Sequence, residues 1–134
     1  MEILIGIKDE LSDDYHNSLL RCIDKCRSLP ETYLFSACEK HIEEVKKEYE
    51  KNIIVDYESA KKLFDAFQII RDSWKDFNDD SETILKAAMY YYALDEDEES
   101  DTESFLGFDD DVAIANACFN AVGRSDLVID LTIR

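Results

Sequence analysis

Carboxylates dominate one short stretch of this chain, residues 95–111, which reads DEDEESDTESFLGFDDD. Ten of its seventeen residues are Asp or Glu, and the apolar tetrapeptide FLGF separates two acidic clusters. Clustered carboxylates can ligate divalent cations, act in acid–base catalysis or attract a basic protein surface. The spacing of the residues distinguishes among these three kinds of chemistry.

The first half of this stretch has the alternation of a calcium-binding EF-hand loop, with acids at Asp95, Asp97, Glu99 and Asp101. An EF-hand needs Gly at the sixth position and a bidentate Glu at the twelfth, and this chain has Ser100 and Leu106 there. An EF-hand is therefore excluded. Weaker binding of divalent cations is still expected from the density of charge alone.

Thiols and one imidazole form a second candidate, Cys22-x3-Cys26-x11-Cys38-x2-His41, whose spacing is similar to a zinc site. A helical turn near Ser28 would put His41 and Cys26 on the order of 10 Å apart along the second helix, too far to share one ion. We therefore expect the cysteines to be small core residues, with zinc as the minority alternative.

Other catalytic patterns are missing from the sequence. No Ser or Cys has the Gly-flanked elbow of a nucleophile, no Gly-rich loop could hold phosphates, and His16 and His41 fall on separate helices. We predict a protein that is not an enzyme and needs no cofactor, with a divalent cation as the open alternative.

The charge of the chain limits its partners. Its formal net charge is −17, of which residues 81–134 carry −10 and residues 1–80 carry −7. Such a field repels nucleic acid and anionic membranes and attracts basic proteins. The opening MEILIGIKDE has no basic n-region, and four Cys without a secretory signal indicate free thiols in a reducing, cytoplasmic setting.

Apolar spacing predicts the elements that hold these residues. With 134 residues, only three Gly and one Pro, the chain is expected to form a single domain, 1–134, that is mainly α, with about five helices in a compact bundle. The segments MEILIGI and LVIDLTI are β-rich and are candidates for a short terminal strand pair, within one chain or across a homodimer. The predicted helices span about residues 12–27, 28–52, 56–77, 82–94 and 109–122.

Their predicted ends carry recognisable signals. Ser12, Asp56 and the run NDDSE (78–82) are predicted N-caps, Ser28 to Glu31 is a capping box, and Gly123 follows the last helix. The stripe of the third helix is expected to continue through Trp74 to Phe77.

A further pattern runs from Tyr91, the aromatic near the end of an apolar helix, through Asp97, Asp101 and Gly107 to the Asp110–Asp111 pair and another apolar helix. With this spacing, residues 60–123 resemble the YkvA-like domain, a bacterial and archaeal family of unknown function. In that family, a loop of the form SPIDLIPDFIP, a Gly and an Asp pair join two such helices. This chain departs from the family where acidic or hydroxyl residues replace its loop prolines and apolar residues: Asp95, Glu96, Glu98, Glu99, Ser100, Thr102 and Ser104.

The leading hypothesis is a non-enzymatic acidic module that binds and inhibits a basic protein. The partner would be a nuclease, toxin or nucleic-acid-binding protein. The chain would bind it in the way that immunity proteins and nucleic-acid mimics bind their targets. Phe105 or Phe108 would anchor the contact. The steering carboxylates would be Asp95, Asp97, Glu99, Asp101 and Glu103.

The second hypothesis is a YkvA-like divalent-cation site, regulatory or of unknown enzymatic role, built from Asp97, Asp101, Asp110 and Asp111. For Asp110 and Asp111, capping of a helix N-terminus is the favoured role. The third reading is an acidic surface that serves only solubility.

Overall fold

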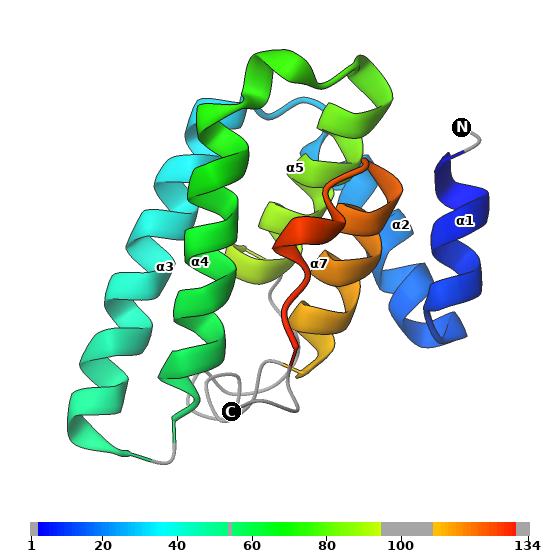
Figure 1. Cartoon of the computed structure of the whole chain (residues 1–134). Coiled ribbons are helices and arrows are strands. Elements are labelled where there is room, and N and C mark those ends of the chain that lie inside the picture. The colour runs from blue at the N-terminus through cyan, green and yellow to red at the C-terminus, as the bar shows by residue number, and fades with distance from the viewer. Residues whose placement is uncertain (1–2, 54, 95–108, 131–134) are drawn as a thin grey trace.

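The computed structural model describes residues 3–53, 55–94 and 109–130. Within these ranges the chain forms six α-helices and two short 3₁₀ helices and contains no strand, which confirms the mainly α prediction (Figure 1). In chain order they are α1 (Ile3–Glu10), α2 (Asp13–Cys26), α3 (Glu31–Lys51), α4 (Tyr57–Asp72), η1 (Trp74–Asp76), α5 (Asp79–Ala93), α7 (Asp109–Ala121) and η2 (Ser125–Leu127).

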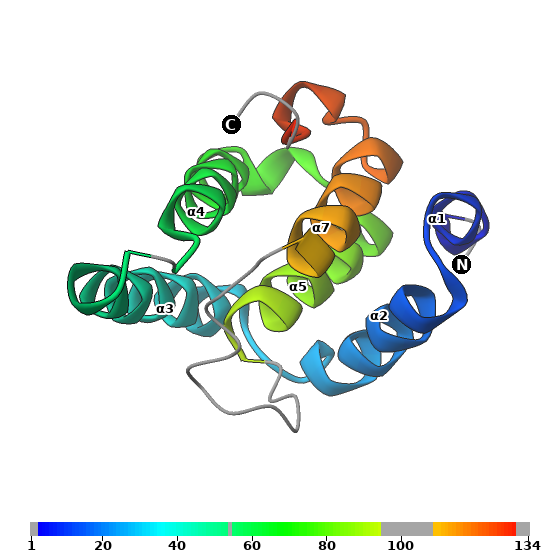
Figure 2. The same cartoon turned by 90° about the horizontal axis from the view of Figure 1, so that it is seen from below.

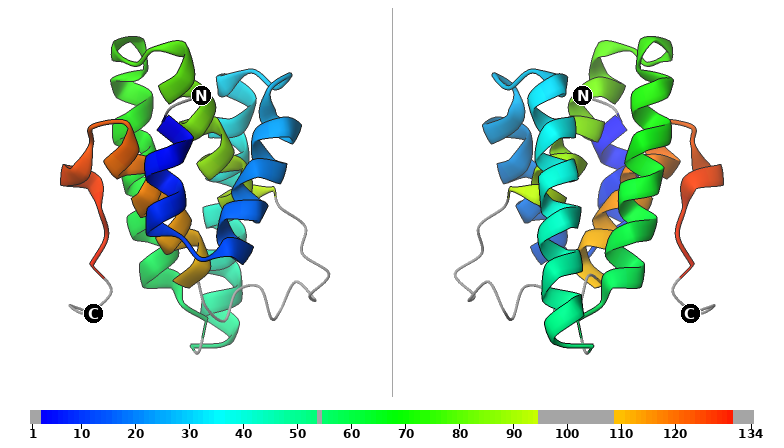
Figure 3. Two further views of the ribbon diagram at one scale, coloured as in Figure 1. Left: turned by 90° about the vertical axis from the view of Figure 1, so that its right-hand side faces the viewer. Right: turned by 90° about the vertical axis from the view of Figure 1, so that its left-hand side faces the viewer.

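Helix α5 lies at the centre of the bundle and packs against α2, α3 and α7 (Figure 2). Helices α3 and α4 form an antiparallel hairpin on one side, and α1 packs on α7 on the other (Figure 3). This central position explains why α5 carries so few charges after its first turn, since Ile84, Leu85, Ala88 and Met89 are all buried.

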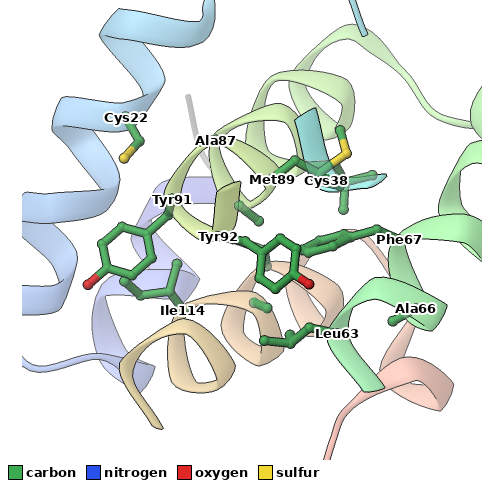
Figure 4. Close-up of a cluster of buried hydrophobic side chains, with 14 of the residues drawn as sticks. Cys22, Cys38, Leu63, Ala66, Phe67, Ala87, Met89, Tyr91, Tyr92 and Ile114 are labelled. Atoms are coloured by element: carbon green, nitrogen blue, oxygen red, sulfur yellow. The ribbon is translucent and has the colours of Figure 1, made fainter. Parts of the chain in front are cut away.

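The core is one continuous cluster to which every α-helix contributes. The rings of Phe67 from α4 and Phe119 from α7 meet with centroids 5.9 Å apart, and Tyr92 from α5 packs on Phe67 (Figure 4). Burying such aromatic side chains contributes on the order of 2–3 kcal/mol each. All four cysteines are buried, which confirms their prediction as core residues.

Several helix ends lie where the sequence predicts. Gly123 follows α7 with φ +81°, a conformation that favours glycine, and so terminates that helix. Three side-chain oxygens accept first-turn N–H groups at 2.8–3.2 Å: Ser12 from Tyr15, Asp56 from Ser59 and Asn78 from Ser81.

Helix α3 begins later than the capping box predicts. Its N-cap is Pro30, in an extended conformation and without a side-chain cap, so Ser28 is not the N-cap. The N–H of Leu29 bonds to the carbonyl of Cys26 in a tight turn, and that turn takes up the residues before Pro30.

The prediction of an N-terminal strand is wrong. Residues 3–10 form α1, in which Leu4 and Ile7 turn toward the core at helical spacing, and Ile7 is fully buried. At the other end, the Asn116 side chain on α7 bonds to both the N–H (2.8 Å) and the carbonyl (2.9 Å) of Ile129. The described part of the tail is therefore fixed to α7 rather than paired as a strand, while residues 131–134 lie outside the described ranges.

The prediction that α4 continues to Phe77 is also wrong. The Ser73 hydroxyl donates to the carbonyls of Ile69 (3.0 Å) and Ile70 (3.4 Å), which closes α4 at Asp72. Trp74 then begins the 3₁₀ turn η1, and Trp74 and Phe77 are half-buried instead of lying in a helical stripe.

Candidate functional site

The acidic segment joins the C-terminal end of α5 to the N-terminal end of α7. The predicted steering acids Asp95, Asp97, Glu99, Asp101 and Glu103, and the predicted anchors Phe105 and Phe108, lie outside the described residues. So do Asp97 and Asp101 of the predicted cation site. Asp110 and Asp111, in the first turn of α7, are the two predicted site residues that the structure describes.

A short hydrogen bond joins the two helices that flank the segment. The Tyr91 hydroxyl on α5 donates to Oδ2 of Asp110 on α7 at 2.6 Å. The phenol is nearly buried, and hydrogen bonds to a carboxylate of this length are about twice as strong as neutral ones. The bond fixes the spacing between the two helix ends.

Asp110 therefore has a structural partner. Asp110 accepts from Tyr91, and both residues of the Asp pair lie in the first turn of α7, where the helix dipole favours negative charge; capping of this helix by the pair stays a prediction. Within the part of the chain that the structure describes, no three His, Cys, Asp or Glu side chains come together as a metal site.

A polar group of side chains lies inside the core beside this region. The Tyr92 hydroxyl donates to the carbonyl of Ala60 on α4 (2.9 Å), and the His41 ring from α3 meets the Tyr92 ring edge-on at 4.7 Å. Tyr91 and Tyr92 project from α5 in different directions (Figure 4). Tyr92 thereby ties the first turn of α4 to the central helix.

Burial keeps these groups uncharged. It lowers the pKa of His41 to about 4 and raises the pKa values of Tyr92 and Cys38 above their ordinary ranges, with smaller effects from neighbouring acidic groups on Tyr92 and Cys38. A thiol that resists ionisation is a poor nucleophile. The cluster is therefore suited to packing rather than to acid–base or covalent chemistry.

At the α4–α5 connection, Trp74 and Phe77 pack half-buried against the edge of the core. Edge-on ring pairs join Phe35 to Trp74 (centroids 5.5 Å apart) and Trp74 to Phe77 (6.2 Å), so these rings lie outside the helical stripe that the sequence predicts. The signal was Ser73, a residue that often ends helices, placed between Asp72 and Trp74.

Comparison of the chain with protein-family models, with curated proteins and with solved structures gave no match. Among the described helices, none is long and apolar enough to cross a membrane. The YkvA-like resemblance stays a prediction that rests on the residues of this chain.

Proposed function

We propose that this chain is a non-enzymatic module that binds a basic protein through its acidic segment and inhibits it. The observation that carries the proposal is the concentration of charge: seven of the nine residues from Asp95 to Glu103 are carboxylates in a chain of net charge −17. Like-charge repulsion at this density opposes folding and is relieved when a basic surface approaches.

The helices beside the segment support this role. The Tyr91–Asp110 bond holds the ends of α5 and α7 at one end of the bundle, so the segment starts and finishes on a rigid base. Part of the ordering that binding requires is then already present in the free protein. The acids supply fast association and Phe105 or Phe108 supplies affinity.

Capture from a lysate of the source organism tests the proposal. Wild type is compared with a variant in which the seven carboxylates of residues 95–103 are replaced by Asn or Gln, at low and then moderate salt. We expect a basic protein, such as a nuclease, toxin or nucleic-acid-binding protein, that is retained by wild type alone and whose activity falls when it is bound. Equal capture by both proteins, or none by either, contradicts the proposal.

The second candidate function is a divalent-cation site of the YkvA-like type. One observation favours it: two positions of the resemblance, Tyr91 and Asp110, meet at 2.6 Å. It predicts stoichiometric Ca²⁺, Mg²⁺ or Mn²⁺ binding that survives moderate salt and is lost in Asp97→Asn/Asp101→Asn. Calorimetric titration that gives only weak, non-saturating heats contradicts it.

A further inference from the structure

The α4–α5 connection combines half-buried aromatic rings with exposed carboxylates. We define the aromatic corner as Trp74, Phe77, Asp76, Asp79 and Asp80, which run along η1 into the first turn of α5. The corner lies at the end of the bundle opposite to the helix ends that flank residues 95–108 (Figure 1). It is therefore separate from the surface of the proposed function.

The rings of the corner are held in place from below. Phe35, which is 6% exposed, packs its ring edge-on against the indole of Trp74 at an interplanar angle of 86°. Ser73 caps α4 and accepts a hydrogen bond from Nη1 of Arg124 (3.2 Å), which ties the start of η1 to the end of α7. The half-buried indole is thus a preorganised platform with few rotamers to lose on binding.

The charge beside the platform is only partly compensated. Arg71 pairs with Asp72 (3.6 Å). Asp126 and, to a smaller extent, Asp76 raise the pKa of the Arg124 guanidinium. Residues 72–82 contain five acids and one Lys. The two nearest arginines are already engaged, Arg71 with Glu39 (3.4 Å) and Arg124 with Asp126 (2.9 Å). Among the described residues, Asp76, Asp79 and Asp80 form no ion pair, and all three are exposed.

The dipole of α5 accounts for acids in its first turn without any ligand. It does not account for Trp74, the only Trp of the chain, which is half-buried beside them and packs against the edge of the core. Trp with flanking carboxylates is the combination that recognises guanidinium groups, because the cation stacks on the indole face while its N–H groups bond to the acids. Nucleic acid and anionic lipid are repelled by the same charges.

We propose that the aromatic corner is a second contact surface, which binds an arginine-bearing basic segment of a partner protein. A guanidinium lies over Trp74, and Asp76, Asp79 and Asp80 pair with it and with its basic neighbours. The proposal goes beyond the proposed function, and it needs none of residues 95–108.

Trp74 reports directly on this binding because it is the only Trp in the chain. Wild type is titrated with hexa-arginine, hexa-lysine and hexa-glutamate peptides while indole fluorescence is followed. We expect a saturable change with hexa-arginine, a weaker one with hexa-lysine and none with hexa-glutamate. A response that is absent or never saturates overturns the proposal.

Matched variants distinguish binding at the aromatic corner from nonspecific attraction by the net charge of the chain. Asp76→Asn/Asp79→Asn/Asp80→Asn is expected to weaken hexa-arginine binding about tenfold or more. Glu43→Gln/Glu44→Gln/Glu50→Gln removes the same charge from exposed positions of α3 and is expected to change the affinity less than about twofold. Equal losses in the two variants overturn the proposal, and far-UV circular dichroism confirms that both fold.

The variant neutralised at residues 95–103 tells the two proposals apart. It is expected to keep the Trp74 response, even though it loses the lysate partner of the proposed function. Loss of the response in this variant, with retention in the corner variant, overturns the aromatic corner and leaves the proposed function standing.

Discussion

The two ends of helix α4 both carry aromatic side chains that are at least partly accessible, but their charges are arranged differently. At the N-terminal end, the α3–α4 hairpin tip consists of Tyr49 and Tyr57, whose rings lie 5.5 Å apart, and Ile53, which is 81% exposed. At the C-terminal end lies the aromatic corner around Trp74.

Residues 46–62, around the hairpin tip, contain five Lys and four acids, so their net charge is +1. Lys51 pairs with Glu48 (4.0 Å) and Lys62 with Glu58 (3.2 Å) within single helices. At the aromatic corner the acids outnumber the bases and lack such pairs. For the proposed basic partner of a chain of net charge −17, we therefore expect steering to depend on which carboxylates are left unpaired rather than on their number.

The largest expected effect is a loss of stability at low pH caused by His41, which packs on Tyr92 in the core that joins both ends of α4. Because burial lowers the pKa of His41 from 6.5 to about 4, the unfolded chain binds more protons than the folded one between these pH values. The contribution of neutral His41 to the free energy of unfolding is fully present above pH 6.5. It falls by up to about 3 kcal/mol as the pH drops to 4. Urea unfolding from pH 7 to pH 4 measures it.

The control for this experiment is His41→Leu, which should have a flatter stability profile over the same pH window. Hydrogen exchange at low pH should accelerate at both ends of α4 together, because the core is shared. If the free energy of unfolding of His41→Leu depends on pH as steeply as that of wild type, the role of His41 is contradicted.

The next effect should loosen one end of α4 only. Tyr92→Phe removes the hydroxyl that donates to Ala60 in the first turn of α4, and the loss of this buried hydrogen bond costs about 1 kcal/mol because the carbonyl keeps its helical N–H partner. Amide exchange should accelerate most near residues 57–60 and least near the aromatic corner. Equal acceleration at both ends would show that this bond does not fix the N-terminal end.

Ser73→Ala should loosen the opposite end by about 1 kcal/mol. It removes the hydroxyl that bonds to the carbonyls of Ile69 and Ile70 and accepts from Arg124. We expect the fluorescence anisotropy of Trp74 to decay faster and hexa-arginine to bind more weakly. Amide exchange at the hairpin tip should stay unchanged. Indole dynamics like those of wild type would contradict the preorganised platform.

The smallest effect is expected at the hairpin tip. Lys62→Gln removes the exposed i,i+4 pair with Glu58 and should cost a few tenths of a kcal/mol, on the order of 0.3–0.5, at low salt. The loss should vanish at high salt because exposed pairs are screened. Thermal unfolding at two ionic strengths measures it, and a salt-independent loss would show that packing of the lysine stem matters instead.

Much of the fold follows from local signals in the sequence. Ser12, Asp56 and Asn78 cap helices as predicted because a short polar side chain before an apolar stripe satisfies first-turn N–H groups locally. Ile3, Ile5 and Ile7 also fit a strand, and helical packing of Ile7 on its neighbours decides the outcome. That preference is set by tertiary contacts, which a short apolar run does not reveal.

In the candidate sites too, local sequence signals predict some features and tertiary packing decides the others. The place of Asp110 in the first turn of an apolar helix follows from the sequence, whereas its bond to Tyr91 depends on how α5 and α7 pack. The half-buried position of Trp74 in η1 depends on where α4 ends, and the Ser73 hydroxyl fixes that end by tertiary and local hydrogen bonds. Spacing in the sequence identifies the groups, and packing determines which of them face each other.

The association rate of the captured basic partner tests the central claim most directly. It is measured against ionic strength for wild type, for the variant neutralised at residues 95–103, and for a control that loses seven exposed carboxylates elsewhere: Asp9, Asp13, Asp14, Asp24, Glu43, Glu44 and Glu50. We predict that the first variant associates at least about tenfold more slowly than the control at low salt, with a flatter salt dependence. Equal rates for the two variants would contradict the account and leave the acidic segment as a surface that serves only solubility.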